Sequence, residues 1–154
     1  MIAILPGSYD PITRGHIEII KKACELYDKV YVVAFVNPKK EYFFTAEERL
    51  EMLTLATKDF KNVYTDFNGG RVIDYMDEKG IDIIVKGYRN DEDLEYEREM
   101  ARWNLENGGY ETVFIECDDA FRDISSTEAR RAIATYDELS DLLTPEIAEF
   151  VKKH

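Results

Sequence analysis

A lone histidine near the start of the chain stands where it could bind a phosphate group. Residues 6–16 read Pro-Gly-Ser-Tyr-Asp-Pro-Ile-Thr-Arg-Gly-His and follow the apolar run Ile2–Leu5. This pattern predicts a short buried strand, a turn, and then the first turn of a helix that contains His16. A helix N-terminus offers free backbone N–H donors and partial positive charge, so His16 would lie beside an anion-binding position.

Positively charged side chains follow two other predicted strands at the points where those strands end. Lys40 closes the segment after the second strand, and Lys86 and Arg89 belong to the segment after the fourth. Ligands of open α/β sheets bind beyond the carboxyl ends of the strands, so we expect these cations to converge with His16. Such a set suits a polyphosphate, because phosphoryl chemistry needs mainly positioning and charge neutralisation. Neither GxxxxGK[ST] nor GxGxxG is present.

Short apolar runs alternate with helix-like stretches along the whole chain. The strand-like runs are Ile2–Leu5, Val30–Val36, Asn62–Thr65, Ile81–Val85 and Thr112–Glu116. The helix-like stretches are 14–27, 46–58, 70–79, 91–107, 126–134 and 145–153. This alternation predicts a parallel sheet with right-handed crossovers. We expect one Rossmann-like, doubly wound α/β domain over 1–154, with a five-stranded parallel sheet and C-terminal helices.

Capping signals mark the positions where the predicted helices begin. Thr13 is expected to cap the first helix, which places His16 at the third helical position, where a capping box has Glu or Gln. His16 is therefore expected to make no such box, and its presence calls for another reason. Segments 45–48 and 125–128 have the capping-box pattern, and Thr144-Pro145 pairs a cap with a proline at the first helical position.

The composition is that of an ordinary globular protein, and it narrows the classes of partner. A net charge of −12 disfavours extended nucleic-acid binding, which needs a basic surface. No apolar run approaches the roughly 20 residues that cross a bilayer, and no leader segment is evident. Cys24 and Cys117 form neither a disulfide framework nor a metal motif, so we expect a cytoplasmic protein with no membrane partner.

Three segments together resemble the phosphopantetheine adenylyltransferases, bacterial members of the nucleotidylyltransferase superfamily. Residues 6–16 resemble the T/HxGH signature, and the other two segments are Lys-Gly-Tyr-Arg at 86–89, followed by Asp-Leu-Glu-Tyr-Glu at 93–97, and Ile-Ser-Ser-Thr at 124–127. The likeness covers essentially the whole chain. It implies transfer of the adenylyl group of ATP to 4′-phosphopantetheine, giving dephospho-coenzyme A and pyrophosphate in the penultimate step of coenzyme A biosynthesis. It also implies Mg²⁺ as a cofactor and a homohexamer.

The resemblance further implies which residues carry the reaction. The expected catalytic residues are His16, which matches a transition-state-stabilising histidine, Lys40 and Arg89. The expected phosphopantetheine-binding residues are Ser8, Lys40, Val72 and Lys86. The expected ATP-binding residues are Ser8, Tyr9, His16, Gly87, Tyr88, Arg89, Glu97, Phe121, Arg122, Asp123, Ile124, Ser125, Ser126 and Thr127. No protein metal site is expected, because ATP phosphates and water would hold most of the Mg²⁺ coordination.

Some of these positions have simpler structural explanations. Arg89 could merely pair with a carboxylate of 91–93, and Ser125 could do no more than cap its helix. Asp10 is expected to brace its turn by accepting hydrogen bonds from local N–H groups. Tyr42 stands where the family commonly has a proline after the basic pair, and Lys86 where arginine is frequent.

Two other functions stay open from the sequence. One is a related adenylyltransferase, for instance one acting on nicotinate mononucleotide, although Lys40 and the segments at 86–89 and 95–97 argue against it. The other is a non-catalytic nucleotide-binding protein on the same fold, which would be expected to lack His16 or Lys40.

Overall fold

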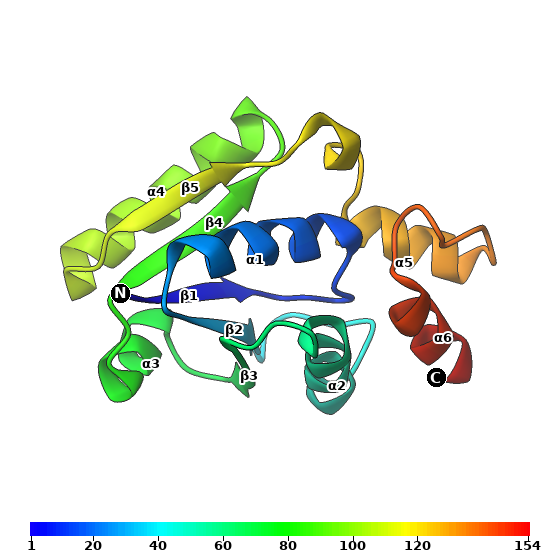
Figure 1. Ribbon diagram of the computed structural model, residues 1–154, viewed down its shortest axis with the longest axis horizontal. Coiled ribbons are helices and arrows are strands. Elements are labelled where there is room, and N and C mark those ends of the chain that lie inside the picture. Colours follow the sequence, from blue (N-terminus) through cyan, green and yellow to red (C-terminus); the bar gives the residue numbers. More distant parts are fainter.

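A five-stranded, all-parallel sheet forms the centre of the protein, whose residues 1–154 are all described by a computed structural model (Figure 1). The strands are β1 (Ile2–Gly7), β2 (Lys29–Phe35), β3 (Val63–Asn68), β4 (Ile83–Tyr88) and β5 (Thr112–Glu116). They lie in the order β3-β2-β1-β4-β5. The predicted α/β fold with a five-stranded parallel sheet is confirmed.

Helices cover both faces of the sheet. They are α1 (Arg14–Leu26), α2 (Ala46–Thr57), α3 (Val72–Lys79), α4 (Asp91–Gly108), α5 (Ser126–Ala134) and α6 (Pro145–Lys153), with a 3₁₀ turn at Asp119–Phe121. Helices α5 and α6 follow the last strand and lie together at one end of the molecule (Figure 1). None of these helices combines the length and the apolar character that crossing a bilayer requires.

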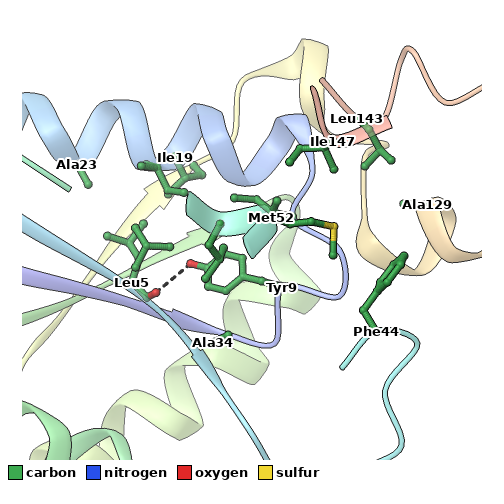
Figure 2. Packing of buried hydrophobic residues seen from close by; sticks show 14 of the residues in the cluster. Leu5, Tyr9, Ile19, Ala23, Ala34, Phe44, Met52, Ala129, Leu143 and Ile147 are labelled. Carbon is green, nitrogen blue, oxygen red and sulfur yellow. Dashed lines mark hydrogen bonds between the residues drawn. The ribbon is translucent and has the colours of Figure 1, made fainter. Parts of the chain in front are cut away.

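Successive side chains of a strand point to opposite faces of the sheet and so belong to two separate apolar clusters. Ala3 and Leu5 of β1 belong to the larger cluster, which α1, α2, α5 and α6 cover, whereas Ile4 belongs to the smaller cluster under α3. Figure 2 shows the larger cluster, where Leu5 and Tyr9 meet side chains of α1 and α2. In β2, Val32, Val33 and Ala34 are all fully buried, as predicted for a strand covered on both faces.

Strand boundaries differ from the prediction where backbone pairing continues past the apolar run. β1 extends to Gly7 because residues 6 and 7 still pair with Val33 and Ala34 of β2. β4 begins two residues later than predicted and continues to Tyr88, which pairs with Glu116 of β5. Helices α5 and α6 and strand β5 match their predicted bounds residue for residue.

Two of the predicted helix caps need correction. Ser125 accepts a hydrogen bond from the Glu128 N–H, but the Glu128 carboxylate pairs with Arg131, so the predicted capping box is wrong. Thr144 makes no capping hydrogen bond through its side chain. The box at Thr45 and Glu48 is confirmed, with both reciprocal hydrogen bonds present at 3.1 and 2.9 Å.

The strand order reverses direction between β1 and β4, which places the carboxyl ends of these two strands side by side. Crevices at such a switch point are where open α/β sheets bind ligands. Helix α1 packs tightly against β4 here, since a Cβ atom at Gly87 would lie 2.7 Å from Cγ1 of Ile19. A glycine at position 87 therefore lets α1 bring its N-terminus close to the end of β4.

Candidate functional site

A cavity of about 580 Å³ opens at the carboxyl ends of β1 and β4. Its volume is within the range of small-molecule sites. The predicted site residues that line it are Ser8, Tyr9, His16, Lys40, Val72, Lys86, Gly87, Tyr88, Arg89, Glu97, Ile124, Ser125, Ser126 and Thr127. They come from the turns after β1, β2 and β4, from the end of β4, from α1, α3 and α4, and from the start of α5 and the segment that leads into it.

Three predicted ATP-binding residues, Phe121, Arg122 and Asp123, do not line the cavity. They lie in and after the 3₁₀ turn. Arg122 donates a hydrogen bond to the Arg89 carbonyl at 2.7 Å and pairs with Asp119 and Glu116. In this structure Arg122 thus fixes the backbone beneath Arg89.

His16 forms a capping box with Thr13, so the expectation that it makes none is wrong. The Thr13 hydroxyl accepts from the His16 N–H at 3.4 Å, and the Thr13 N–H donates to His16 Nδ1 at 3.0 Å. The imidazole nitrogen replaces the carboxylate or amide oxygen that usually accepts at this position. Because Nδ1 accepts this hydrogen bond, the proton of the neutral ring is on Nε2.

The environment keeps the His16 ring neutral. Burial, followed by the positive charges of Lys86 and Arg89, lowers the pKa of His16 to about 4. The ring lies edge-on to Tyr9, with centroids 5.0 Å apart. At neutral pH the Nε2–H of His16 is therefore a hydrogen-bond donor in a cavity that also contains fixed positive charge.

Lys40, which lines the cavity, and Arg130, which contacts the lining residue Thr127, have no carboxylate partner. Lys40 Nζ donates to the Ser8 hydroxyl at 3.1 Å. Arg130 donates to the Asp10 carbonyl at 2.9 Å and to the Thr127 hydroxyl at 3.2 Å. Sequence analysis missed Arg130, since nothing in the sequence separates it from Arg131, which pairs with two carboxylates on the surface.

Two cations at the end of β4 and just after it are paired with carboxylates of α4. Lys86 Nζ lies 3.5 Å from Glu97 Oε2 and donates to the Pro6 carbonyl at 3.1 Å. Arg89 Nε lies 2.9 Å from Asp93 Oδ2. The simpler explanation for Arg89, pairing with a nearby acid, thus holds in this structure, although Arg89 also lines the cavity.

Asp10 ties the β1–α1 turn to a distant segment. Asp10 is 3% exposed, and its carboxylate accepts hydrogen bonds from the N–H groups of Phe43 and Phe44 at 2.8 and 2.9 Å. The expectation that Asp10 braces its own turn locally is wrong, because the donors lie 33 and 34 residues away. Asp10 therefore holds the loop that carries Lys40 against the turn that carries Ser8.

No three or more His, Cys, Asp or Glu side chains are arranged to hold a metal ion. The carboxylates that line the cavity, Asp93 and Glu97, are engaged with Arg89 and Lys86. Cys117 also lines the cavity, but burial raises the pKa of its thiol, which favours the protonated form over the nucleophilic thiolate. The arrangement is suited to binding anions and to donating hydrogen bonds to them.

Known proteins that share one name are similar to this chain over nearly its full length. Residues 4–132 match the family model described as cytidylyltransferase-like. A phosphopantetheine adenylyltransferase from Corynebacterium diphtheriae is 41% identical, with 95% of this chain and 92% of the relative aligned. Enzymes of the same name from Thermotoga neapolitana and Clostridium botulinum are 37% and 39% identical, covering 96% and 98% of this chain and 92% and 93% of the relatives.

A solved structure shares the fold at low identity. It is described as a putative nicotinate-nucleotide adenylyltransferase from Vibrio parahaemolyticus, and it superimposes with a TM-score of 0.71. The superposition covers 99% of this chain and 91% of the other, at 14% identity. At that identity, the likeness establishes the fold alone.

Proposed function

Because the chain belongs to the phosphopantetheine adenylyltransferases of the cytidylyltransferase-like family, we propose that it transfers the adenylyl group of ATP to 4′-phosphopantetheine. The products are dephospho-coenzyme A and pyrophosphate, so the protein is a nucleotidyltransferase of coenzyme A biosynthesis. The observation that carries the mechanism is a neutral His16, fixed by Thr13, in a cavity lined by cations.

The reaction needs one bond to form and one to break. A phosphate oxygen of phosphopantetheine attacks the α-phosphorus of ATP, and the bond from that phosphorus to the oxygen bridging the α- and β-phosphates breaks. Negative charge builds on the α-phosphate oxygens and on the departing pyrophosphate. Preorganised donors aimed at such charge are commonly the largest contribution that an enzyme makes.

His16 is the donor proposed for the α-phosphate. Its Nε2 carries the proton because Nδ1 accepts from the Thr13 N–H. A neutral donor suits this role, since it can bind a non-bridging oxygen without needing to change its protonation state during the reaction. The hydrogen bond strengthens as charge develops, so it lowers the barrier more than it tightens ATP binding.

We assign one substrate to each end of the cavity. We assign the acceptor phosphate to Ser8, Lys40 and Lys86, with Val72 of α3 beside the pantetheine arm. We assign the triphosphate to Arg89 and the start of α5, where Ser126 and Thr127 stand at a helix N-terminus. Arg130 adds a second guanidinium there, adjacent to Thr127.

Mg²⁺, the homohexamer and a cytoplasmic location complete the proposal. Because the cavity carboxylates are already paired, ATP phosphates and water are the expected ligands of Mg²⁺, which would neutralise triphosphate charge. A self-association surface is available on α4, an 18-residue helix with no buried residue, where Trp103 and Leu105 are exposed outside the cavity. Both cysteines are free, which suits a reducing compartment.

Pyrophosphate release tests the function. The protein is incubated with ATP, Mg²⁺ and either 4′-phosphopantetheine or nicotinate mononucleotide, and the nucleotide product is identified by mass spectrometry. We expect pyrophosphate and dephospho-coenzyme A in equal amounts with the first acceptor and no turnover with the second. Turnover with nicotinate mononucleotide alone would contradict the proposal, and binding of ATP without turnover of either acceptor would favour a non-catalytic nucleotide-binding protein.

A further inference from the structure

A buried arginine behind the cavity wall has no charged partner. Arg49 of α2 is 1% exposed, and its guanidinium forms no ion pair with a carboxylate. Its Nε has no hydrogen-bond partner at all. Burying a charge without a counterion is unfavourable, so a hydrophobic side chain of similar size would be expected to serve stability at least as well. A buried, unpaired guanidinium in this position suggests a role outside folding.

Arg49 contacts the turn that carries Ser8 and Tyr9. Its Nη1 donates to the Ser8 carbonyl at 2.8 Å. The Ser8 carbonyl and the Tyr9 N–H belong to one trans peptide unit, so they point in opposite directions. The Tyr9 N–H forms no hydrogen bond within the protein, and Tyr9 lines the cavity. Arg49 thus fixes the orientation of a free backbone donor at the site.

The same peptide precedes a strained residue. Tyr9 has φ of +48°, in the left-handed region that side chains other than glycine rarely adopt. Such a conformation persists only when its surroundings hold it. Two contacts hold it here: the Arg49 hydrogen bond to the Ser8 carbonyl, and the Tyr9 hydroxyl, which donates to the Leu5 carbonyl at 2.9 Å (Figure 2).

Tyr42 links Arg49 to Lys40. The Arg49 guanidinium carbon lies 3.9 Å from the centroid of the Tyr42 ring, and Lys40 Nζ lies 5.3 Å from the same centroid. The Tyr42 hydroxyl accepts from the Asn37 N–H at 2.9 Å, which anchors the loop. One aromatic ring therefore packs against both cations, and Lys40 in turn donates to the Ser8 hydroxyl.

We propose that Arg49, packed on Tyr42, is a positioning residue that holds the Ser8–Tyr9 peptide and Lys40 in the geometry needed at the acceptor-phosphate end of the cavity. The proposal rests on the adenylyltransfer function given above. Arg49 does not line the cavity and is expected to touch neither substrate. It acts by aiming the Tyr9 N–H into the site, and its uncompensated positive charge favours an anion beyond the turn.

Kinetics and thermal stability of Arg49→Met test this role together. Loss of positioning lowers kcat about 10- to 100-fold and raises the KM for phosphopantetheine, whereas the KM for ATP stays within about 3-fold. The melting temperature stays unchanged or rises, because a buried unpaired charge is removed. Arg49→Lys, which keeps the charge and a donor, should recover part of the kcat. If Arg49 had only a structural role, Arg49→Met would instead lower the melting temperature and leave kcat and the KM for phosphopantetheine unchanged.

Matched variants keep the outcome decisive. Thr57→Val removes another buried polar group of α2, which donates only to Leu53 of its own helix at 2.7 Å, so it should lower stability and leave kcat and both KM values within about 2-fold. If Arg49→Met fails to fold, Tyr42→Leu tests the positioning role in its place, because Tyr42 packs on Arg49. It removes the ring from an exterior loop and should lower kcat about 3- to 10-fold, with Tyr42→Phe less affected.

Three results separate the possible failures. Unchanged kinetics of folded Arg49→Met would overturn the positioning role and leave the adenylyltransfer function intact. Unchanged kinetics of Tyr42→Leu would overturn it in the same way where Arg49→Met does not fold. A wild-type protein without turnover of phosphopantetheine would overturn the proposed function and the inference with it.

Discussion

Two groups of cations in and behind the cavity wall have different electrostatic surroundings. In the first group, Lys40, Arg49 and Arg130 donate to hydroxyl and carbonyl oxygens and have no carboxylate partner. In the second group, Lys86 of β4 and Arg89, which follows β4, are each paired with a carboxylate of α4. An anion near the first group meets uncompensated charge, whereas near the second it must share or displace a carboxylate. The first group is therefore preorganised, and the second is expected to exchange partners when ligand binds.

Replacing His16 should have the largest effect, because His16 provides the neutral donor that is proposed to act on the α-phosphate and that Thr13 holds in place. His16→Ala should lower kcat about 100- to 1,000-fold, the usual cost of losing one donor to a transition-state oxyanion. ATP affinity, measured by calorimetry, should change by less than about 3-fold. His154→Ala is the control, since that ring stacks on Phe150 at the far end of the chain and should leave kcat unchanged. Equal losses in kcat and ATP affinity would show uniform binding instead.

Neutralising one cation of each group tests directly whether a carboxylate partner matters for binding. Lys40→Met should raise the KM for phosphopantetheine about 10- to 100-fold, because a hydrogen bond to a charged group contributes about 1.5–3 kcal/mol. Lys86→Met should raise it less, since Glu97 already compensates that charge. Lys39 is exposed beside Lys40, so Lys39→Met should change neither kcat nor the KM for phosphopantetheine. If Lys40→Met and Lys86→Met raise this KM equally, the carboxylate partner of Lys86 has no consequence for binding.

The fold follows largely from local signals in the sequence. The bounds of α5, α6 and β5 were predictable because cap residues, proline and turn residues flank their periodic segments. The ends of β1 and β4 were not, because pairing with a neighbouring strand extends them past their apolar runs. The all-parallel order followed from alternation of strands and helices, which leaves few topologies.

The site was predictable where residues follow strand ends, and less so where tertiary contacts decide. His16 and Lys40 stood out by position, and Arg89 by its neighbours in sequence. Arg49 looks like any charged residue of an amphipathic helix, and only the structure shows that it is buried beneath Ser8. Likewise, the partners of Asp10 come from the segment before α2, and a histidine as capping-box acceptor departs from the usual pattern.

The pH dependence of stability should report the environment of His16. Its folded-state pKa is about 4, below the ordinary 6.5, so the unfolded chain takes up this proton first as pH falls. The contribution of the neutral ring is present above pH 6.5 and is lost between pH 6.5 and about 4. In urea unfolding at pH 7, 6 and 5, the wild type should lose more free energy of unfolding than His16→Ala. Parallel curves would mean that the ring titrates normally when folded.

The smallest expected effect comes from removing the carboxylate partner of Arg89, a cation of the second group. Asp93→Asn removes the carboxylate charge that ATP must displace, so ATP should bind about 2- to 5-fold tighter, in line with about 0.2–1 kcal/mol for a partly exposed ion pair. Asp91→Asn is the matched control, since it removes the same charge from the first turn of α4 but forms no ion pair with Arg89. Weaker ATP binding to Asp93→Asn would show that the pair orients Arg89 for the ligand instead of competing with it.

The central claim is that His16 enters the reaction as a neutral Nε2–H donor held by the Thr13 N–H. Nitrogen NMR of the imidazole rings measures this directly, and a second histidine, His154, is the only other signal to assign. Titrated from pH 8 downwards, the His16 ring should show the Nε2–H tautomer at neutral pH and take up its second proton only near pH 4. A pKa of 6 or higher, or a proton on Nδ1, would contradict the account.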